Sequence, residues 1–219
     1  MGLTPFTKQQ LLPQEEKLEI ARHKSQLFIG IPKETSYQER RICLTPDAVN
    51  SLTSHGHRVM LEAGAGLSAS YSDKEYSDAG AEITNDTKKV LSCPMLLKVE
   101  PLTREEIKMV NPETIVISAI QLKTRKKEYF DVLMKKKVTA LAFEYIKDED
   151  GSYPAVKSLS EIAGTASVLV ASELMINNDF GKGLLFGNIT GVPPTDVVIL
   201  GAGTVGEFAA KTAVGLGAS

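Results

Sequence analysis

The sequence is poor in the residues that build metal centres and disulfides. It has two cysteines, Cys43 and Cys93, and three histidines among 219 residues. The cysteines lie in apolar, strand-like contexts and lack metal-ligand spacing. His55 and His57 lie at a helix–strand junction, where structural or solvated roles are the usual ones. We therefore expect no metal site, and a reduced, intracellular protein with two core thiols.

An excess of one charge and a long apolar run are also missing. The formal net charge is −2 at pH 7, which gives no general attraction to nucleic acid or anionic membrane. Residues 1–24 are polar and show no secretory signal. The longest apolar run, 163–171, includes Thr165 and Ser167 and is too short to span a bilayer. The basic runs 123–127 and 135–137 flank a predicted helix and are expected to be solvated.

What remains is an ordinary globular composition, 42% hydrophobic and 24% charged, in a length that suits one or two domains. Apolar segments of strand length alternate with segments that carry helix-start signals, such as the N-cap and proline of Thr45-Pro46 and the capping box Thr103–Glu106. The predicted strands are 27–31, 59–61, 95–99, 114–120 and 139–143. The predicted helices begin at Thr45, near Asp73, at Thr103 and at Thr124, and the last of these ends at Leu133.

This alternation predicts an α/β fold, with a parallel sheet of the flavodoxin or Rossmann type covered on both faces. Ligands bind such sheets beyond the carboxyl ends of the strands. Here those ends are residues 31–41, 98–101, 121–123 and 144–145.

One stretch near the end of the chain carries a specific motif. The apolar run Val197–Leu200 leads into Gly201-Ala202-Gly203-Thr204-Val205-Gly206, a Gly-x-Gly-x-x-Gly turn that is followed by a helical pattern. In this context the turn predicts a dinucleotide site, because the N–H groups of the first helical turn face a pyrophosphate. We assign Gly201, Gly203, Thr204, Val205 and Gly206 to cofactor binding. The similar pattern at 64–69 is followed by a loop and is rejected.

Two further features suggest how the chain is divided. Ser158–Glu161 reads as a capping box that opens a long helix through about Ile176, which we interpret as an interdomain connector. The acidic residue expected about 20 residues past the first glycine of the turn lies beyond Ser219. We therefore expect an extension over 1–26, a catalytic domain over 27–157, a connector over 158–178, and the start of a truncated dinucleotide-binding domain over 179–219.

Taken together, the motifs resemble those of the alanine dehydrogenases and of the nicotinamide-binding subunit of proton-translocating transhydrogenase. The segments that carry the resemblance run through the chain in the family's order. They are 29–35 (IGIPKET), 39–46 (ERRICLTP), 63–66 (AGAG), 97–99 (LKV), 160–164 (SEIAG) and 201–206. The resemblance implies a catalytic domain joined to a Rossmann domain, and NAD as the cofactor.

The family's functional positions carry over only in part. Arg41 matches the arginine that binds the substrate carboxylate, and a guanidinium fork suits that group. Ser160 matches a serine that contacts the cofactor. The family's second lysine is absent from 97–101 (LKVEP), where Lys98 matches only the first. Gln121 stands at the catalytic histidine's position; it can hydrogen-bond a carbonyl but cannot act as an acid or base. The catalytic aspartate would lie past Ser219.

Three functions remain open on these residues. The first is an NAD-dependent oxidoreductase of the alanine dehydrogenase type, acting on a small 2-amino or 2-oxo acid, with Arg41, Lys98 and Gln121 as catalytic residues. It would be a cytoplasmic homo-oligomer without nucleic-acid or membrane partners, and the fragment alone would be inactive. The second is a transhydrogenase NAD(H)-binding subunit, which lacks support because 148–154 has no Arg–Gln–Asp set. The third is a non-catalytic, nucleotide-binding regulatory protein.

Overall fold

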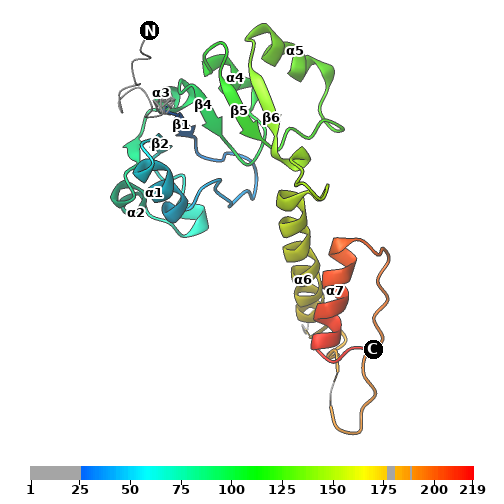
Figure 1. The fold of residues 1–219 in the computed structure, drawn as a ribbon. Helices are drawn as coiled ribbons and strands as arrows, with labels where there is room; N and C mark the ends of the chain where they lie inside the picture. Colours follow the sequence, from blue (N-terminus) through cyan, green and yellow to red (C-terminus); the bar gives the residue numbers. More distant parts are fainter. Residues whose placement is uncertain (1–25, 177–180, 188) are drawn as a thin grey trace, which may run out of the picture.

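The computed structural model describes residues 26–176, 181–187 and 189–219, so the extension expected over 1–26 lies almost wholly outside the described residues. The predicted α/β architecture is confirmed. Six parallel strands form one sheet in the order β3-β2-β1-β4-β5-β6. Figure 1 labels five of these strands, from β2 and β1 through β4 and β5 to β6. The strands are β1 Phe28–Ile31, β2 Arg58–Glu62, β3 Glu82–Thr84, β4 Met95–Leu97, β5 Ile115–Ser118 and β6 Thr139–Ala142.

This strand order is that of dinucleotide-binding folds. Strands β1 to β3 are added toward one edge of the sheet and β4 to β6 toward the other, so the order of addition reverses between β1 and β4. In a parallel sheet the crevice outside the carboxyl ends at such a reversal is the usual ligand site. The loops that follow β1 and β4 are therefore where the fold itself places a binding site. The predicted residues Arg41 and Lys98 belong to these two loops.

Helices cover both faces of the sheet, which gives two cores. One core joins Met60, Leu96 and Val116 to apolar side chains of α3, α4 and α5, and the other joins β1 and β2 to α1 and α2. The helices are α1 Pro46–Ser54, α2 Asp73–Asp78, α3 Thr87–Leu91, α4 Arg104–Met109, α5 Lys127–Lys135, α6 Pro154–Ile176 and α7 Thr204–Gly215, with short 3-10 turns η2 Leu67–Ala69 and η3 Phe143–Tyr145.

Several helix-start predictions are confirmed at the level of single hydrogen bonds. The Thr45 hydroxyl accepts a bond from the Ala48 N–H, and Pro46 is the first helical residue. Thr103 and Glu106 form the reciprocal capping box at the start of α4. The 64–69 stretch is a turn followed by η2, in agreement with its rejection as a cofactor turn.

Other boundaries differ from the prediction. Helix α5 starts at Lys127 rather than Thr124, because Thr124 and Arg125 donate backbone bonds to the Gln121 carbonyl and form a turn. Helix α6 starts at Pro154, so Ser158 and Ser160 are interior residues rather than caps. Pro154 explains the earlier start, since proline suits the first helical position. Strand β3 and helix α3 were not predicted at all.

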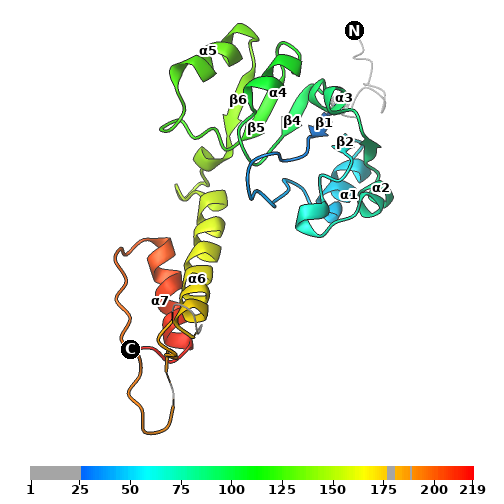
Figure 2. The same cartoon turned by 180° about the vertical axis from the view of Figure 1, so that it is seen from behind.

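The C-terminal part forms a second packing unit away from the sheet. Helix α6 extends from the sheet edge, and α7 packs along it in every view (Figures 1 and 2). The predicted strand 197–200 has no strand partner among the described residues, but Val197 and Ile199 pack with Val168 of α6 and Ala209 of α7. A Cβ on Gly164 would lie 2.4 Å from the Val205 carbonyl oxygen, so glycine permits the close approach of the two helices.

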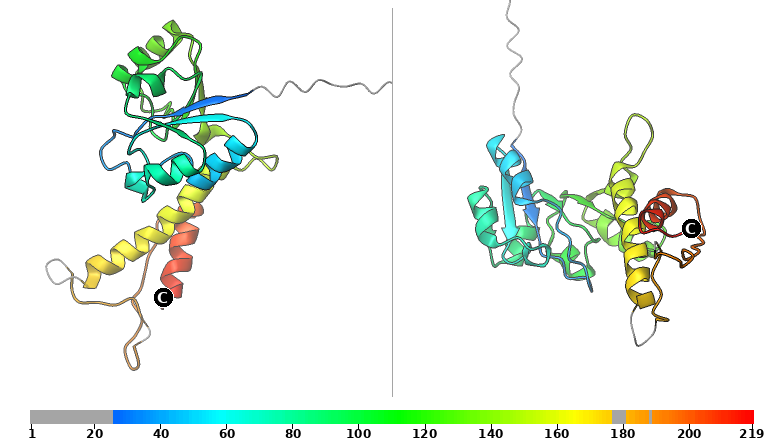
Figure 3. Two further views of the ribbon diagram at one scale, coloured as in Figure 1. Left: turned by 90° about the vertical axis from the view of Figure 1, so that its left-hand side faces the viewer. Right: turned by 90° about the horizontal axis from the view of Figure 1, so that it is seen from below.

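Helix α6 is also the one described helix that is long and apolar enough to cross a membrane by length and composition alone. Its mean hydropathy reaches 1.4 over 18 residues, of which 11% are buried. The run 163–171 alone was judged too short to span a bilayer, whereas the helix that contains it has 23 residues. Its packing against α7, which Figure 3 shows from two further sides, gives part of its apolar surface a partner within the chain.

A substitution at Gly30 tests the packing of the central strand. A Cβ there would lie 2.5 Å from the Val90 carbonyl oxygen and 2.9 Å from Leu96 Cδ2. We expect Gly30→Ala to lower the free energy of unfolding by about 1–3 kcal/mol, measured by urea denaturation. Gly215→Ala is the matched control, because nothing lies within 4 Å of its Cβ position. Equal stability of the two variants would contradict this packing.

Candidate active site

Three predicted residues gather at the carboxyl ends of neighbouring strands. Arg41 lies in the long loop after β1, Lys98 directly follows β4, and Gln121 lies three residues after β5. Their surroundings differ sharply, however. Lys98 is fully buried, Gln121 is half-buried and the Arg41 side chain is 49% exposed. They therefore belong to one region but do not all face a ligand in the same way.

Lys98 is held by carboxylates from two other segments. Its Nζ donates a 2.9 Å hydrogen bond to Glu34 Oε2 and lies 3.7 Å from Glu106 Oε1. The other Glu34 oxygen accepts a 2.6 Å bond from the Val99 N–H. A buried ammonium group requires such partners, because desolvating it alone costs several kcal/mol. Lys98 thus joins the loop after β1 to the end of β4 and the start of α4.

Arg41 is held from one side by Glu39. Its Nε and Nη2 donate bonds of 2.9 and 2.6 Å to the two Glu39 oxygens, and Nη2 lies 3.9 Å from Glu100 Oε1. The hydrogen bond from Arg41 lowers the pKa of Glu39, and the bond to Glu39 raises the pKa of Arg41. Within the described part of the chain the Nη1 group has no hydrogen-bond partner, so it is the free edge of the guanidinium.

Gln121 stands in a conformation that L-residues rarely adopt, with φ +56°. Its N–H donates to Glu144 Oε1 at 2.8 Å, and its Nε2 donates to Glu100 Oε2 at 3.2 Å. Arg125 Nη2 lies 3.4 Å from Gln121 Oε1. Backbone strain of this kind persists where the surroundings impose it, often at functional sites. Glu100 contacts both predicted substrate-binding side chains, because one of its oxygens lies near Arg41 and the other accepts from Gln121.

A cavity of about 430 Å³ adjoins this region. Arg41, Lys98 and Val99 line it from the sheet, and Ala155, Ser158 and Leu159 line it from the first turns of α6. Cys43 also lines it, and burial raises the pKa of this thiol to about 12, which keeps it protonated and unreactive. The wall is thus mostly apolar, with the Arg41 guanidinium at one side, which is the composition of a small-molecule pocket.

The glycine turn forms a second cavity, of about 490 Å³, on the neighbouring side of α6. Gly201 has φ +120°, and a Cβ on Gly206 would lie 2.1 Å from the Gly201 carbonyl oxygen. Gly203 caps α7 without a side chain and has open space around it. The N–H groups of the first turn, Thr204 to Gly206, are therefore available to an anion. Ser160 lines the same cavity.

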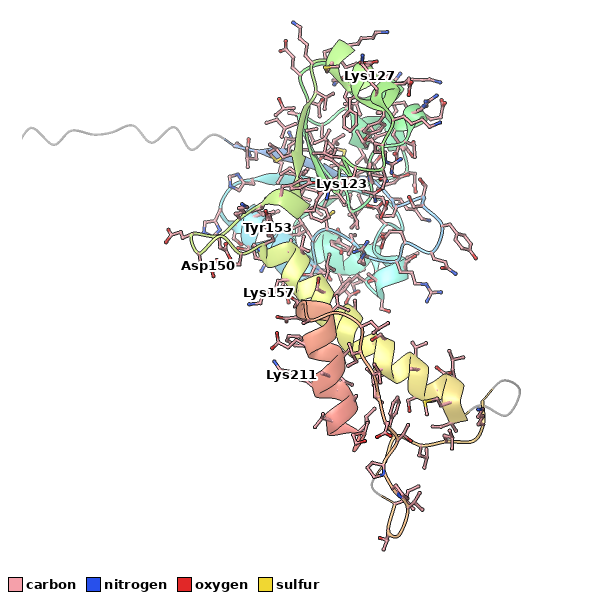
Figure 4. The ribbon with its side chains drawn as sticks, turned by 90° about the vertical axis from the view of Figure 1, so that its right-hand side faces the viewer. Lys123, Lys127, Asp150, Tyr153, Lys157 and Lys211 are labelled. Atoms are coloured by element: carbon pink, nitrogen blue, oxygen red, sulfur yellow. The ribbon has the colours of Figure 1, made fainter. Side chains whose placement is uncertain are left out.

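The basic runs lie largely on the surface, as predicted. Lys123 and Lys127 are exposed; Figure 4 shows Lys127 at the top of the sheet domain and Lys123 lower on the same domain, with Lys157 and Lys211 farther along the α6–α7 pair. Two members of these runs are structural instead. The half-buried Arg125 contacts Gln121, and Lys136 donates bonds of 2.6 Å to the carbonyl oxygens of Lys108 and Val110. Among the described residues no cluster suits a metal ion.

Family models cover nearly the whole described chain. The model of the alanine dehydrogenase/PNT N-terminal domain matches residues 30–163, and that of the alanine dehydrogenase/PNT C-terminal domain matches residues 167–219. The chain belongs to the alanine dehydrogenase/PNT family. The resemblance inferred from the motifs is thus confirmed, and the family is one of oxidoreductases.

Individual relatives agree with this membership. The alanine dehydrogenase of Methanococcus maripaludis is 37% identical over 193 residues, which are 88% of this chain and 52% of that protein. The enzyme of Bacillus subtilis (strain 168) is 38% identical over 192 residues, 88% of this chain and 50% of that protein. The chain therefore spans about half the length of these alanine dehydrogenases.

Solved structures support the fold. A structure titled L-alanine dehydrogenase superposes with a TM-score of 0.83 at 36% identity and covers 88% of this chain and 53% of its own. A transhydrogenase from Sinorhizobium meliloti gives 0.75 at 27% identity, covering 87% of this chain and 54% of its own. Both titles fall within the alanine dehydrogenase/PNT family.

Four carboxylates around the predicted residues were not singled out from the sequence. They are Glu34, Glu39, Glu100 and Glu144. All of them fall in the segments after strand ends, which were predicted to bear ligand-binding residues. Their place in these segments was the one sequence feature that could have marked them. Their pairings join segments far apart in the chain, such as Glu34 with Lys98, 64 residues later. Local sequence patterns do not encode such partners.

The Arg41–Glu39 pair predicts a pH dependence. The pKa of Glu39 is lowered from its ordinary value of 4.5 in the folded protein, so the pair stabilises the fold fully at pH values above 4.5. This stabilisation is lost as the pH falls through the lowered pKa of Glu39. We expect Arg41→Gln to raise the pKa of Glu39 toward 4.5, followed by carbon-13 NMR titration. The exposed neighbour Arg40 supplies the control variant Arg40→Gln. An unchanged Glu39 titration in Arg41→Gln would refute the pairing.

Proposed function

We propose that this chain contributes the substrate domain and the start of the nucleotide domain of an NAD-dependent oxidoreductase of the alanine dehydrogenase type. The reaction is hydride transfer between a nicotinamide and a small 2-amino or 2-oxo acid. The observation that carries the proposal is the position of α6. Its first turns line the cavity of Arg41, and its residues from Ser160 to Ala171 line the cavity of the glycine turn.

Within this function, Arg41 binds the substrate carboxylate through Nη1, the edge that Glu39 leaves free. Gln121 Nε2 hydrogen-bonds the substrate carbonyl or imine nitrogen and polarises it, without taking up a proton. Lys98 acts through Glu34, which fixes the Val99 backbone and therefore the start of the loop that carries Glu100. Because Lys98 is fully buried, we assign it positioning rather than contact with the substrate.

The residues of the glycine turn fit a pyrophosphate group. The N–H groups of Thr204, Val205 and Gly206 point from an uncapped helix start, and a side chain at Gly203 would fill the space beside them. Ser160 lines the same cavity, and we assign its hydroxyl to the same ligand. When bound, the nicotinamide supplies the hydride acceptor or donor. We also propose a homo-oligomer in the cytoplasm, with no nucleic-acid or membrane partner.

A second candidate is a transhydrogenase NAD(H)-binding subunit, favoured by the TM-score of 0.75 with the Sinorhizobium meliloti protein. It predicts hydride exchange between two nucleotides in place of amino-acid oxidation. A third is a non-catalytic nucleotide-binding regulator, for which the glutamine at position 121 is the specific support. It predicts NADH binding without turnover.

The nucleotide site can be tested apart from the chemistry. A Cβ on Gly206 would collide with the Gly201 carbonyl oxygen, so Gly206→Ala must open the turn. We expect this variant to bind NADH at least about tenfold more weakly, followed by NADH fluorescence on the longest product that the gene encodes. Gly215→Ala, in the same helix but in open space, should bind like wild type. Equal binding by both variants would rule out this cradle.

The reaction itself is tested by following NADH formation with L-alanine, and its oxidation with pyruvate and ammonium, on the same gene product. We expect turnover, and a loss of about 10²-fold in kcat/KM for Arg41→Gln, since a charge-assisted carboxylate contact contributes roughly 2–3 kcal/mol. Arg40→Gln is the matched control. The 219 residues alone should be inactive, because they hold only one unit of the nucleotide domain. No turnover with any 2-amino acid would refute the assignment.

A further inference from the structure

The carboxylate of Glu100 lies at the centre of the substrate region. Its Oε1 is 3.9 Å from Arg41 Nη2, and its Oε2 accepts the 3.2 Å bond from Gln121 Nε2. The Glu100 side chain is 22% exposed, whereas the side chains of Glu34, Glu39 and Glu106 are 9% exposed or less. Of the four, Glu100 is therefore the carboxylate that a ligand can reach.

Glu100 is also the more exposed of the two carboxylates that have no cation within hydrogen-bond distance; the other, Glu106, lies 3.7 Å from Lys98 Nζ and its side chain is 8% exposed. Glu34 binds Lys98 at 2.9 Å and Glu39 binds Arg41 at 2.6 Å. Glu100 reaches a cation only at 3.9 Å, which is too long for a hydrogen bond. Its carboxylate has about four acceptor positions, and the Gln121 amide occupies one. Glu100 thus retains acceptor capacity toward a donor that enters beside Arg41.

The local charge favours a ligand that brings a positive group. Among the described residues, the ion pairs of Glu34, Glu39, Glu100 and Glu106 are with Arg41 and Lys98 alone, so the cluster has an excess of two negative charges. Glu144 and Arg125, which contact Gln121, add one charge of each sign and leave that excess unchanged. A plain carboxylate at Arg41 would therefore meet repulsion from Glu100. A zwitterion presents an anion to Arg41 and a cation to Glu100.

We propose that Glu100 is the amino-group subsite, and that it favours 2-amino acids over carboxylic acids such as propionate, which carry neither an amino group nor a carbonyl at the α-carbon. The α-carboxylate binds Arg41 Nη1, and the α-ammonium, one carbon away, donates to Glu100. This inference rests on the proposed function, since it assigns the nitrogen of that substrate to a residue.

The test compares two ligands that differ only in the amino group. On the longest gene product we would measure KM for L-alanine and the inhibition constant of propionate, a competitor without nitrogen. Glu100→Gln keeps the side-chain shape and removes the charge. We expect KM for L-alanine to rise about tenfold, while propionate binds as well as before or more tightly. Arg41→Gln should weaken both ligands.

Two further variants make the result decisive. Glu100→Asp keeps the charge and should recover most of the alanine affinity, which a purely structural defect would not allow. Glu105→Gln removes an exposed carboxylate of α4 and should change neither constant. An unchanged alanine KM in Glu100→Gln overturns the amino-group subsite while the oxidoreductase stands. An equal rise for both ligands also overturns it. Absence of turnover in the wild type overturns both assignments.

Discussion

The buried ammonium group of Lys98 is the constraint on which the rest of the site depends. It lies at the reversal point of the sheet with no exposed surface, between Glu34 after β1 and Glu106 in the first turn of α4. Glu106 also accepts from the Thr103 N–H, so the carboxylate that caps α4 approaches Lys98 too. Removing Glu34 would take away the one hydrogen-bonded carboxylate of a buried ammonium, and breaking a buried pair in this way typically costs about 3–5 kcal/mol. Lys98 therefore fixes the loop after β1, the end of β4 and the start of α4 relative to one another.

This anchoring determines what the exposed residues can do. Glu34 binds both Lys98 Nζ and the Val99 N–H, so the backbone is fixed immediately before Glu100. Gln121 is fixed from the other side, by its bond to Glu144 and its left-handed conformation. Arg41, by contrast, lies in the long loop after β1, and its guanidinium donates hydrogen bonds to Glu39, two residues away, with Glu100 at 3.9 Å. The backbone before Glu100 and at Gln121 is thus fixed by contacts between distant segments, whereas the Arg41 guanidinium is held by a residue of its own loop. The Arg41 side chain can therefore adjust to a ligand more easily than its neighbours.

The sequence predicted those features that short-range chemistry decides. Thr45-Pro46 and Thr103–Glu106 start helices because each cap is completed within four residues. Strand β3 and helix α3 have three and five residues, too few to show a periodicity, although Asp86 is a capping residue that could have marked α3. Helix α6 begins at Pro154 and not at the capping box predicted for Ser158–Glu161, because proline suits the first helical position. The partners of Lys98 could not be predicted, since they come from distant segments that only the folded sheet brings together.

Helix α6 links the two halves of the proposed site in a way that a loop could not. Ser158 and Leu159 face the Arg41 cavity, and Ser160 faces the glycine turn. Successive helical residues rise by 1.5 Å and turn by about 100°, so adjacent positions point into two different cavities at a fixed spacing. The α7 helix is held against the same element through Gly164. The spacing between the cavity beside Arg41 and the cavity beside the glycine turn therefore depends on one continuous helix.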